Sequence, residues 1–140
     1  MAKHLLLVDY ENVHKIDLSV LDDGYRAIDE TTLDGLPAPV YHLVGDSSSV
    51  QVQGENVYVA YQDSTVMQLR YGTRDPMKNT WKLENIAGHA TPFKGAYGFY
   101  AQNRVVGGQG IVSSYVIDQR HDVPQFFVEV FAMTLQTIIP

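Results

Sequence analysis

The chain has 140 residues, enough for one domain with a sizeable core, and 45% of them are hydrophobic. Its net charge of −6 argues against a nonspecific nucleic-acid binder, because such proteins normally carry a basic surface. With no cysteine in the sequence, disulfides, thiolate metal sites and cysteine nucleophiles are excluded.

The first predicted element is a short strand over residues 3–8 (KHLLLV), whose continuous aliphatic run fits a strand covered on both faces. Asp9 interrupts this run, so the N-terminus does not match a signal peptide. Residues 14–23 could form a short helix or a loop, and Asp22-Asp23-Gly24 marks a turn. No segment is long enough to span a membrane, so we expect a soluble chain, cytoplasmic as expressed.

From Tyr25 onward the pattern changes to short stretches rich in Val, Tyr, Phe and Thr, separated by Gly, Asp, Asn, Ser and Pro. This pattern predicts a mainly β protein of antiparallel, four-stranded meanders. The predicted strands are 25–31, 40–44, 48–53, 56–62, 67–73, 81–86, 97–103, 110–117 and 125–132.

An internal repeat runs through this β region. Val57–Tyr61 (VYVAY) corresponds to Ile111–Tyr115 (IVSSY), and Asp118 falls close to the place of Asp63. A period near 50 residues with four strands per unit is typical of propeller blades or similar arrays. We therefore divide the chain into an N-terminal segment, residues 1–24, and a β-repeat domain, residues 25–140, whose units are about 25–86 and 87–140.

Residues 25–133 resemble the blades of secreted bacterial β-propellers. The resemblance rests on an ordered motif: Ser48-Ser49, Asn56–Tyr61, Asp63-Ser64, Leu69-Arg70-Tyr71 and Trp81. It implies one four-stranded blade per unit. A closed propeller needs at least four blades and this chain has about two, so it departs from the family pattern. A chain of this kind would have to assemble with copies of itself, be a fragment or adopt another β fold.

Residues 4–28 (HLLLVDYENVHKIDLSVLDDGYRAI) resemble the opening of the NYN branch of PIN-like nucleases. The resemblance implies that Asp9 is a Mg²⁺ or Mn²⁺ ligand and that Asn12 orients the first turn or a substrate phosphate. Such an ion would activate water for attack on a phosphodiester. However, the chain after residue 28 supplies neither the alternating strand–helix pattern nor the later carboxylates of that family. The two unlike resemblances suggest a chimera joined near VLDDGYRAI.

Aromatic residues on the predicted strands suggest a ligand surface. A carbohydrate or peptide groove could be lined by Tyr58, Tyr61, Tyr71 and Tyr115, together with Tyr97 and Tyr100. The alternative is that these tyrosines are cross-strand packing residues with hydroxyls at the rim of the sheet. Both interpretations remain open from the sequence.

No metal site is expected. Asp63, Asp75 and Asp118 each end a strand, where a carboxylate usually accepts hydrogen bonds from the following turn. The spacing does not match an EF-hand, and the histidines show no ligand spacing.

The C-terminal stretch FFVEVFAMTLQTII is strongly apolar, with Glu129 as its only charge. Exposed, it would be an adhesive sheet edge, so we expect it to complete a sheet or to pair with another subunit. The sequence as a whole favours a non-catalytic binding or self-assembly module that forms homo-oligomers. The alternative is a divalent-metal-dependent ribonuclease that uses Asp9.

Overall fold

The computed structural model describes residues 28–32, 40–88, 95–120 and 122–135. Within them the chain forms seven β-strands and no helix, which confirms the predicted mainly β, antiparallel fold. The predicted strand at 3–8 and the segment 14–23 lie outside the described residues. The strands are β1 (Val44–Gln53), β2 (Asn56–Asp63), β3 (Gln68–Asp75), β4 (Thr80–Ala87), β5 (Gly95–Val106), β6 (Gln109–Asp118) and β7 (Gln125–Thr134).

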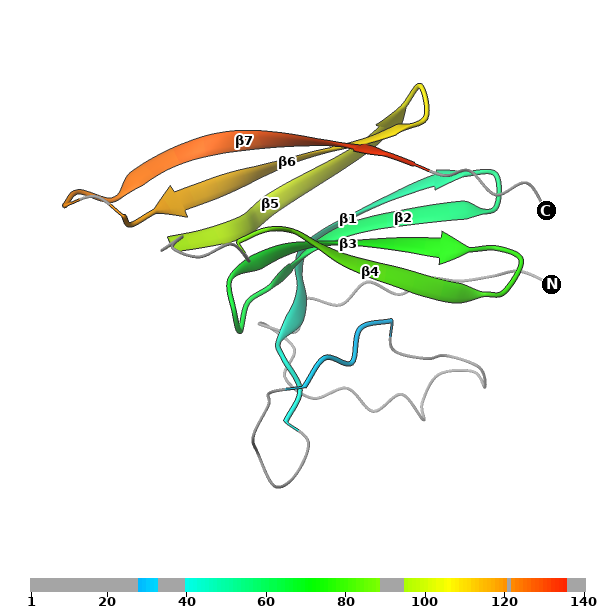
Figure 1. The fold of residues 1–140 in the computed structure, drawn as a ribbon, viewed down its shortest axis with the longest axis horizontal. Helices are drawn as coiled ribbons and strands as arrows, with labels where there is room; N and C mark the ends of the chain where they lie inside the picture. The colour runs from blue at the N-terminus through cyan, green and yellow to red at the C-terminus, as the bar shows by residue number, and fades with distance from the viewer. Residues whose placement is uncertain (1–27, 33–39, 89–94, 121, 136–140) are drawn as a thin grey trace.

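The strands form two antiparallel meanders in two layers (Figure 1). One sheet has four strands in the order β1-β2-β3-β4, and the other has three in the order β5-β6-β7. The second meander therefore has one strand fewer in the described residues than the expected four. Neither sheet closes on itself within the described part of the chain.

The predicted strand 48–53 lies within β1, and each strand predicted from 56–62 onward has an observed strand over nearly the same residues. The predictions were wrong at residues 28–31 and 40–43, which form no regular strand and share only an isolated bridge between Thr32 and Tyr41. A local hydrogen bond explains part of this difference. The backbone N–H of Thr31 donates to Asp29 Oδ1 at 3.0 Å. Such a turn competes with the hydrogen bonds of a sheet.

The hairpin between β5 and β6 shows how the chain reverses. Val106 pairs with Gln109, so Gly107 and Gly108 alone make the connection. Both have positive φ, 57° and 76°, as a type I′ turn requires. This turn matches the twist of the flanking strands and fixes their register.

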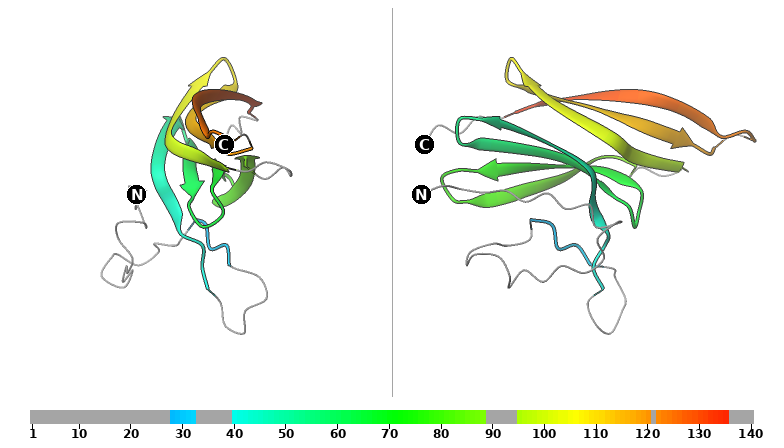
Figure 2. Two further views of the ribbon diagram at one scale, coloured as in Figure 1. Left: turned by 90° about the vertical axis from the view of Figure 1, so that its left-hand side faces the viewer. Right: turned by 180° about the vertical axis from the view of Figure 1, so that it is seen from behind.

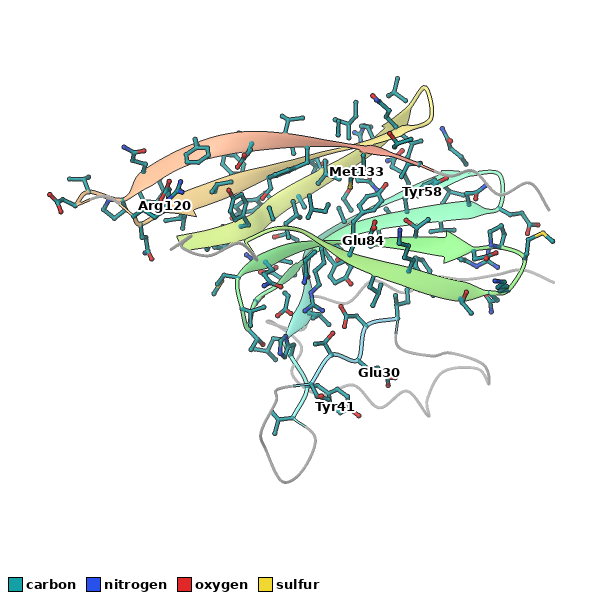
Figure 3. The ribbon with its side chains drawn as sticks, viewed as in Figure 1. Glu30, Tyr41, Tyr58, Glu84, Arg120 and Met133 are labelled. Carbon is teal, nitrogen blue, oxygen red and sulfur yellow. The ribbon has the colours of Figure 1, made fainter. Side chains whose placement is uncertain are left out.

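The core lies between the two sheets (Figure 2). The cluster consists of buried Tyr58, Ala60, Leu69, Tyr71, Ala87, Ala101 and Val112, with Ile86, Tyr97, Val105, Phe131, Met133 and Leu135 packed against it. Tyr58 and Met133, labelled in Figure 3, belong to opposite sheets and meet in this layer. Alternation along β2 and β6 places these apolar side chains on the facing surfaces.

Polar contacts also join the sheets. Asn103 on β5 is fully buried, and its Nδ2 donates to the carbonyl of Tyr58 at 3.0 Å. Its backbone N–H donates to Ser49 Oγ at 3.0 Å. Gln62 Nε2 donates to the carbonyl of Tyr97 at 2.6 Å. These bonds fix how β5 lies against β1 and β2, since an unpaired buried amide would be costly.

A search of the described residues for a helix able to cross a membrane finds none.

Candidate functional site

A buried polar cluster centres on Arg70, on the face of β3 opposite the core. Arg70 Nη1 donates to Asp29 Oδ2 at 2.7 Å and to Thr31 Oγ1 at 2.8 Å. Its Nη2 lies 2.6 Å from Asp63 Oδ2. The Arg70 side chain is 9% exposed, so the guanidinium is largely desolvated and needs these two carboxylates.

Asp63 joins the cluster from the last position of β2. Besides Arg70, its Oδ2 lies 2.6 Å from His42 Nδ1. Its Oδ1 accepts hydrogen bonds from the backbone N–H groups of Thr65 at 3.1 Å and Val66 at 3.4 Å. One carboxylate therefore shapes the β2–β3 turn and also holds the His42 segment against the sheet.

Asp29 is held by three side chains, in addition to the backbone N–H of Thr31. Its Oδ1 accepts from Thr31 Oγ1 at 2.6 Å, and its Oδ2 accepts from Tyr61 Oη and Arg70 Nη1, both at 2.7 Å. Burial alone would raise the pKa of Asp29, but the hydrogen bonds from Thr31, Tyr61 and Arg70 outweigh it and hold the pKa below its ordinary value. Burial and the bond to Asp29 raise the pKa of Tyr61, so its hydroxyl stays a donor.

The cluster joins three separate parts of the chain. Residues 28–32 and 40–43 lie below the four-stranded sheet in Figure 1, on the side away from β5–β7. Figure 3 places Glu30 and Tyr41 in the same region. Both carboxylates are already engaged by Arg70, so the arrangement works as an internal clamp on these two segments.

The predicted ligand-binding tyrosines lie in different places. Tyr58 and Tyr71 are fully buried between the sheets, with ring centroids 6.4 Å apart. Tyr61 is in the polar cluster and is 4% exposed. Tyr115 is 55% exposed on the outer face of β6. The fold therefore does not bring these four side chains together on one surface.

The strand-end aspartates make turn contacts. Asp75 Oδ1 accepts from the N–H groups of Met77 and Lys78 at 2.9 and 3.2 Å. Asp118 Oδ1 accepts from the N–H of Arg120 at 3.0 Å. The described residues contain no group of three or more acidic or histidine side chains placed to hold a metal ion. The predicted nuclease residues Asp9 and Asn12 lie outside the described residues.

An exposed apolar face covers the outer side of β6 and β7. Alternate β7 residues Phe126, Val128 and Val130 are 73%, 53% and 64% exposed. In the strand register, Phe126 pairs with Ile117 and Val128 pairs with Tyr115. The Tyr115 ring also contacts Tyr100 edge-on, with centroids 5.8 Å apart. We call Tyr100, Tyr115, Phe126, Val128 and Val130 the outer apolar face.

The outer apolar face leaves much hydrophobic surface in water. Covering a Val or Phe side chain fully is worth about 1.5–3 kcal/mol relative to leaving it exposed. A contiguous patch of this kind marks an interaction surface more often than isolated exposed apolar residues do. Among the features of the described residues, this face is the best candidate for a functional site.

Sequence reasoning singled out the apolar stretch that forms β7 but missed the polar cluster. Arg70 lies between Leu69 and Tyr71, in the middle of a predicted strand. Because strand residues alternate between faces, a charge between two apolar residues indicates only that Arg70 lies on the face opposite the core, and its burial there has no local signal. Its partner Asp29 is 41 residues away, and no local pattern indicates that distance.

Comparisons with models of known protein families, with curated proteins and with solved structures found no match to this chain.

Proposed function

We propose that this chain is a non-catalytic association module that binds its partner through the outer apolar face. The observation that carries the proposal is the row of exposed side chains on β7, Phe126, Val128 and Val130, beside exposed Tyr115 on β6. Within the described residues this face is exposed, because the core lies on the opposite side of the same strands.

The polar cluster supports a non-catalytic role. Asp29 and Asp63 are both paired with Arg70 and accept further hydrogen bonds from Tyr61, Thr31 and the β2–β3 turn. Structural ion-pair networks have this character, with each carboxylate satisfied internally.

The proposal is tested on the purified chain by light scattering at increasing concentration and by fluorescence of the apolar dye 1-anilinonaphthalene-8-sulfonate. We expect a mass above the 15.7 kDa of one chain, dye binding, or both. The double variant Phe126→Ser/Val128→Ser should abolish whichever signal is found. Met77→Ser, at a 63% exposed position in the β3–β4 turn, is the matched control and should leave the signal unchanged.

A monomeric chain that binds no dye would overturn the proposal. A signal that the double variant retains, with unchanged circular dichroism, would also overturn it, because the association would then use another surface.

A further inference from the structure

We infer that the partner is a second copy of this chain, which adds its β7 antiparallel to β7 of the first. The two three-stranded sheets would then form one continuous six-stranded sheet. This inference rests on the proposed function and goes further by naming the partner and the strand through which it binds.

The free edge of β7 is long and regular. In the described residues β7 has β6 as its only neighbour, so one side of its backbone is unpaired. Its ten residues pair with β6 without a shift in register, whereas β1–β2, β3–β4 and β5–β6 each contain such irregularities. Natural sheets usually protect edges with bulges, prolines or charges, and a flat edge without them is a template for strand addition.

The only charged residue of β7, Glu129, does not protect the free edge of the strand. Glu129 belongs to the core-facing set of alternate residues, and its Oε2 accepts a hydrogen bond from the Tyr97 hydroxyl at 2.9 Å. The opposite edge of the molecule differs. On β4, Lys82 and Glu84 have side chains 74% and 45% exposed, and they pair at 2.8 Å. Edge β4 is therefore protected by charge, and edge β7 is not.

A second copy fits this edge because an antiparallel two-fold pairing requires the same surface on both partners. The exposed β7 residues Phe126, Val128 and Val130 carry no charge, so their best complement is another uncharged apolar strand. The chain itself supplies such a strand. Pairing would place these side chains beside their counterparts on one face of the joined sheet, as aromatic and β-branched cross-strand pairs.

The alternation of β7 limits where the two-fold axis passes. Residues directly opposite each other in an antiparallel pair lie on the same face of the sheet. An axis beside Glu129 would place two carboxylates directly opposite, which is unfavourable. We therefore place the axis beside Val128 or Val130, the outward-facing residues nearest the middle of the strand, so that one of them lies opposite its own counterpart.

Single cysteines test this geometry, because the sequence contains none. We expect Val128→Cys or Val130→Cys to form a disulfide-linked dimer in high yield under mild oxidation, since directly opposed positions bring Cβ atoms within disulfide reach. Leu83→Cys on β4, at an edge position 36% exposed, is the matched control and should remain mostly uncross-linked. Circular dichroism checks that each variant keeps its β structure.

The outcomes separate this inference from the proposed function. Oligomers that depend on Phe126 and Val128, with no β7 cross-link above the control, would overturn β7 pairing and leave the proposed function standing. A monomer that binds the dye through the outer apolar face would overturn the second copy as partner, again without refuting the proposed function. A monomer that binds no dye would overturn both.

Discussion

The hydroxyl of Tyr97 on β5 donates a hydrogen bond to Glu129 on β7, across the intervening strand β6, with an O–O distance of 2.9 Å. The Tyr97 ring also packs edge-on against Phe131, with centroids 6.0 Å apart. Tyr97 thus holds the one carboxylate of β7 on the side of the sheet that faces the core. The outer apolar face and the free edge are left without charge as a result.

Tyr97→Phe should therefore weaken self-association. Without the hydroxyl, the Glu129 carboxylate loses its bond and gains solvation by turning toward the edge, where its charge would oppose the burial of that edge in the dimer. We expect a severalfold higher dissociation constant in sedimentation velocity and a stability loss of about 1–2 kcal/mol in denaturant. Tyr41→Phe, at a 55% exposed position outside the outer apolar face, is the control, and an equal effect there would contradict the role given to Tyr97.

Alkaline pH should also act through Tyr97. Burial and the hydrogen bond to Glu129 raise the pKa of Tyr97 to about 12, above its ordinary value of 10.0. Because the folded-state pKa is raised, the stabilising effect is fully present below pH 10 and is lost as pH rises toward 12. Denaturant midpoints measured between pH 9 and pH 12 should fall less steeply for Tyr97→Phe than for the unmodified chain. Parallel curves would show that Tyr97 does not contribute.

The clamp around Arg70 should be sensitive to loss of Asp29. Asp29→Asn removes one of two buried carboxylates that neutralise Arg70, so we expect a loss of about 3–5 kcal/mol. Glu30→Gln removes the same charge from the next, exposed residue and should change stability by less than about 0.5 kcal/mol. The measurement is chemical unfolding at pH 7, and equal losses in the two variants would contradict the clamp.

Stability at acidic pH should also depend on Asp29. Hydrogen bonds from Thr31, Tyr61 and Arg70 hold the pKa of Asp29 below its ordinary value of 3.8. The stability that this provides is present above pH 4 and is lost as pH falls below it. The Asp29→Asn variant should therefore show a shallower loss of stability between pH 4 and pH 2. An unchanged slope would mean that other carboxylates dominate acid unfolding.

Local patterns predicted most of the strands because hairpin turns and alternation are local properties. Gly107-Gly108 indicated the β5–β6 turn, and alternation gave β2, β3 and β6. The ion pair between Asp29 and Arg70 could not be predicted, since it depends on how segments far apart in sequence meet. The predictions were wrong at residues 28–31 and 40–43 for a related reason. Side-chain hydrogen bonds at Asp29 and His42 replace the sheet pairing that β propensity alone would favour.

Two buried tyrosines of β2, one in the core and one in the polar cluster, differ in their hydrogen bonding, which the sequence could not indicate. The hydroxyl of Tyr58 is buried and has no hydrogen-bond partner among the described residues, whereas that of Tyr61 donates to Asp29. Tyr58→Phe should leave stability unchanged or raise it by about 1 kcal/mol, because an unsatisfied polar group is removed. Tyr61→Phe should cost about 1.5–3 kcal/mol, since it removes a bond to a charged group. Thermal unfolding of both variants measures these effects. A large loss of stability in Tyr58→Phe would contradict the expectation and indicate that the hydroxyl has a hydrogen-bond partner, such as a bound water.

The nuclease alternative makes a separate prediction about Asp9, which lies outside the described residues. If the chain is an association module, incubation of single-stranded RNA with the purified chain and Mg²⁺ or Mn²⁺ should give no cleavage that depends on Asp9. The resemblance to NYN nucleases implies the opposite, because a metal-bound water would need this carboxylate to attack the phosphodiester. Asp9→Asn keeps the size of the side chain and removes its charge, and Asp17→Asn provides a matched control in the same segment.

Metal-dependent cleavage that Asp9→Asn abolishes and Asp17→Asn preserves would establish the ribonuclease and overturn the non-catalytic assignment. Equal traces of cleavage in all three proteins would instead indicate a contaminating nuclease.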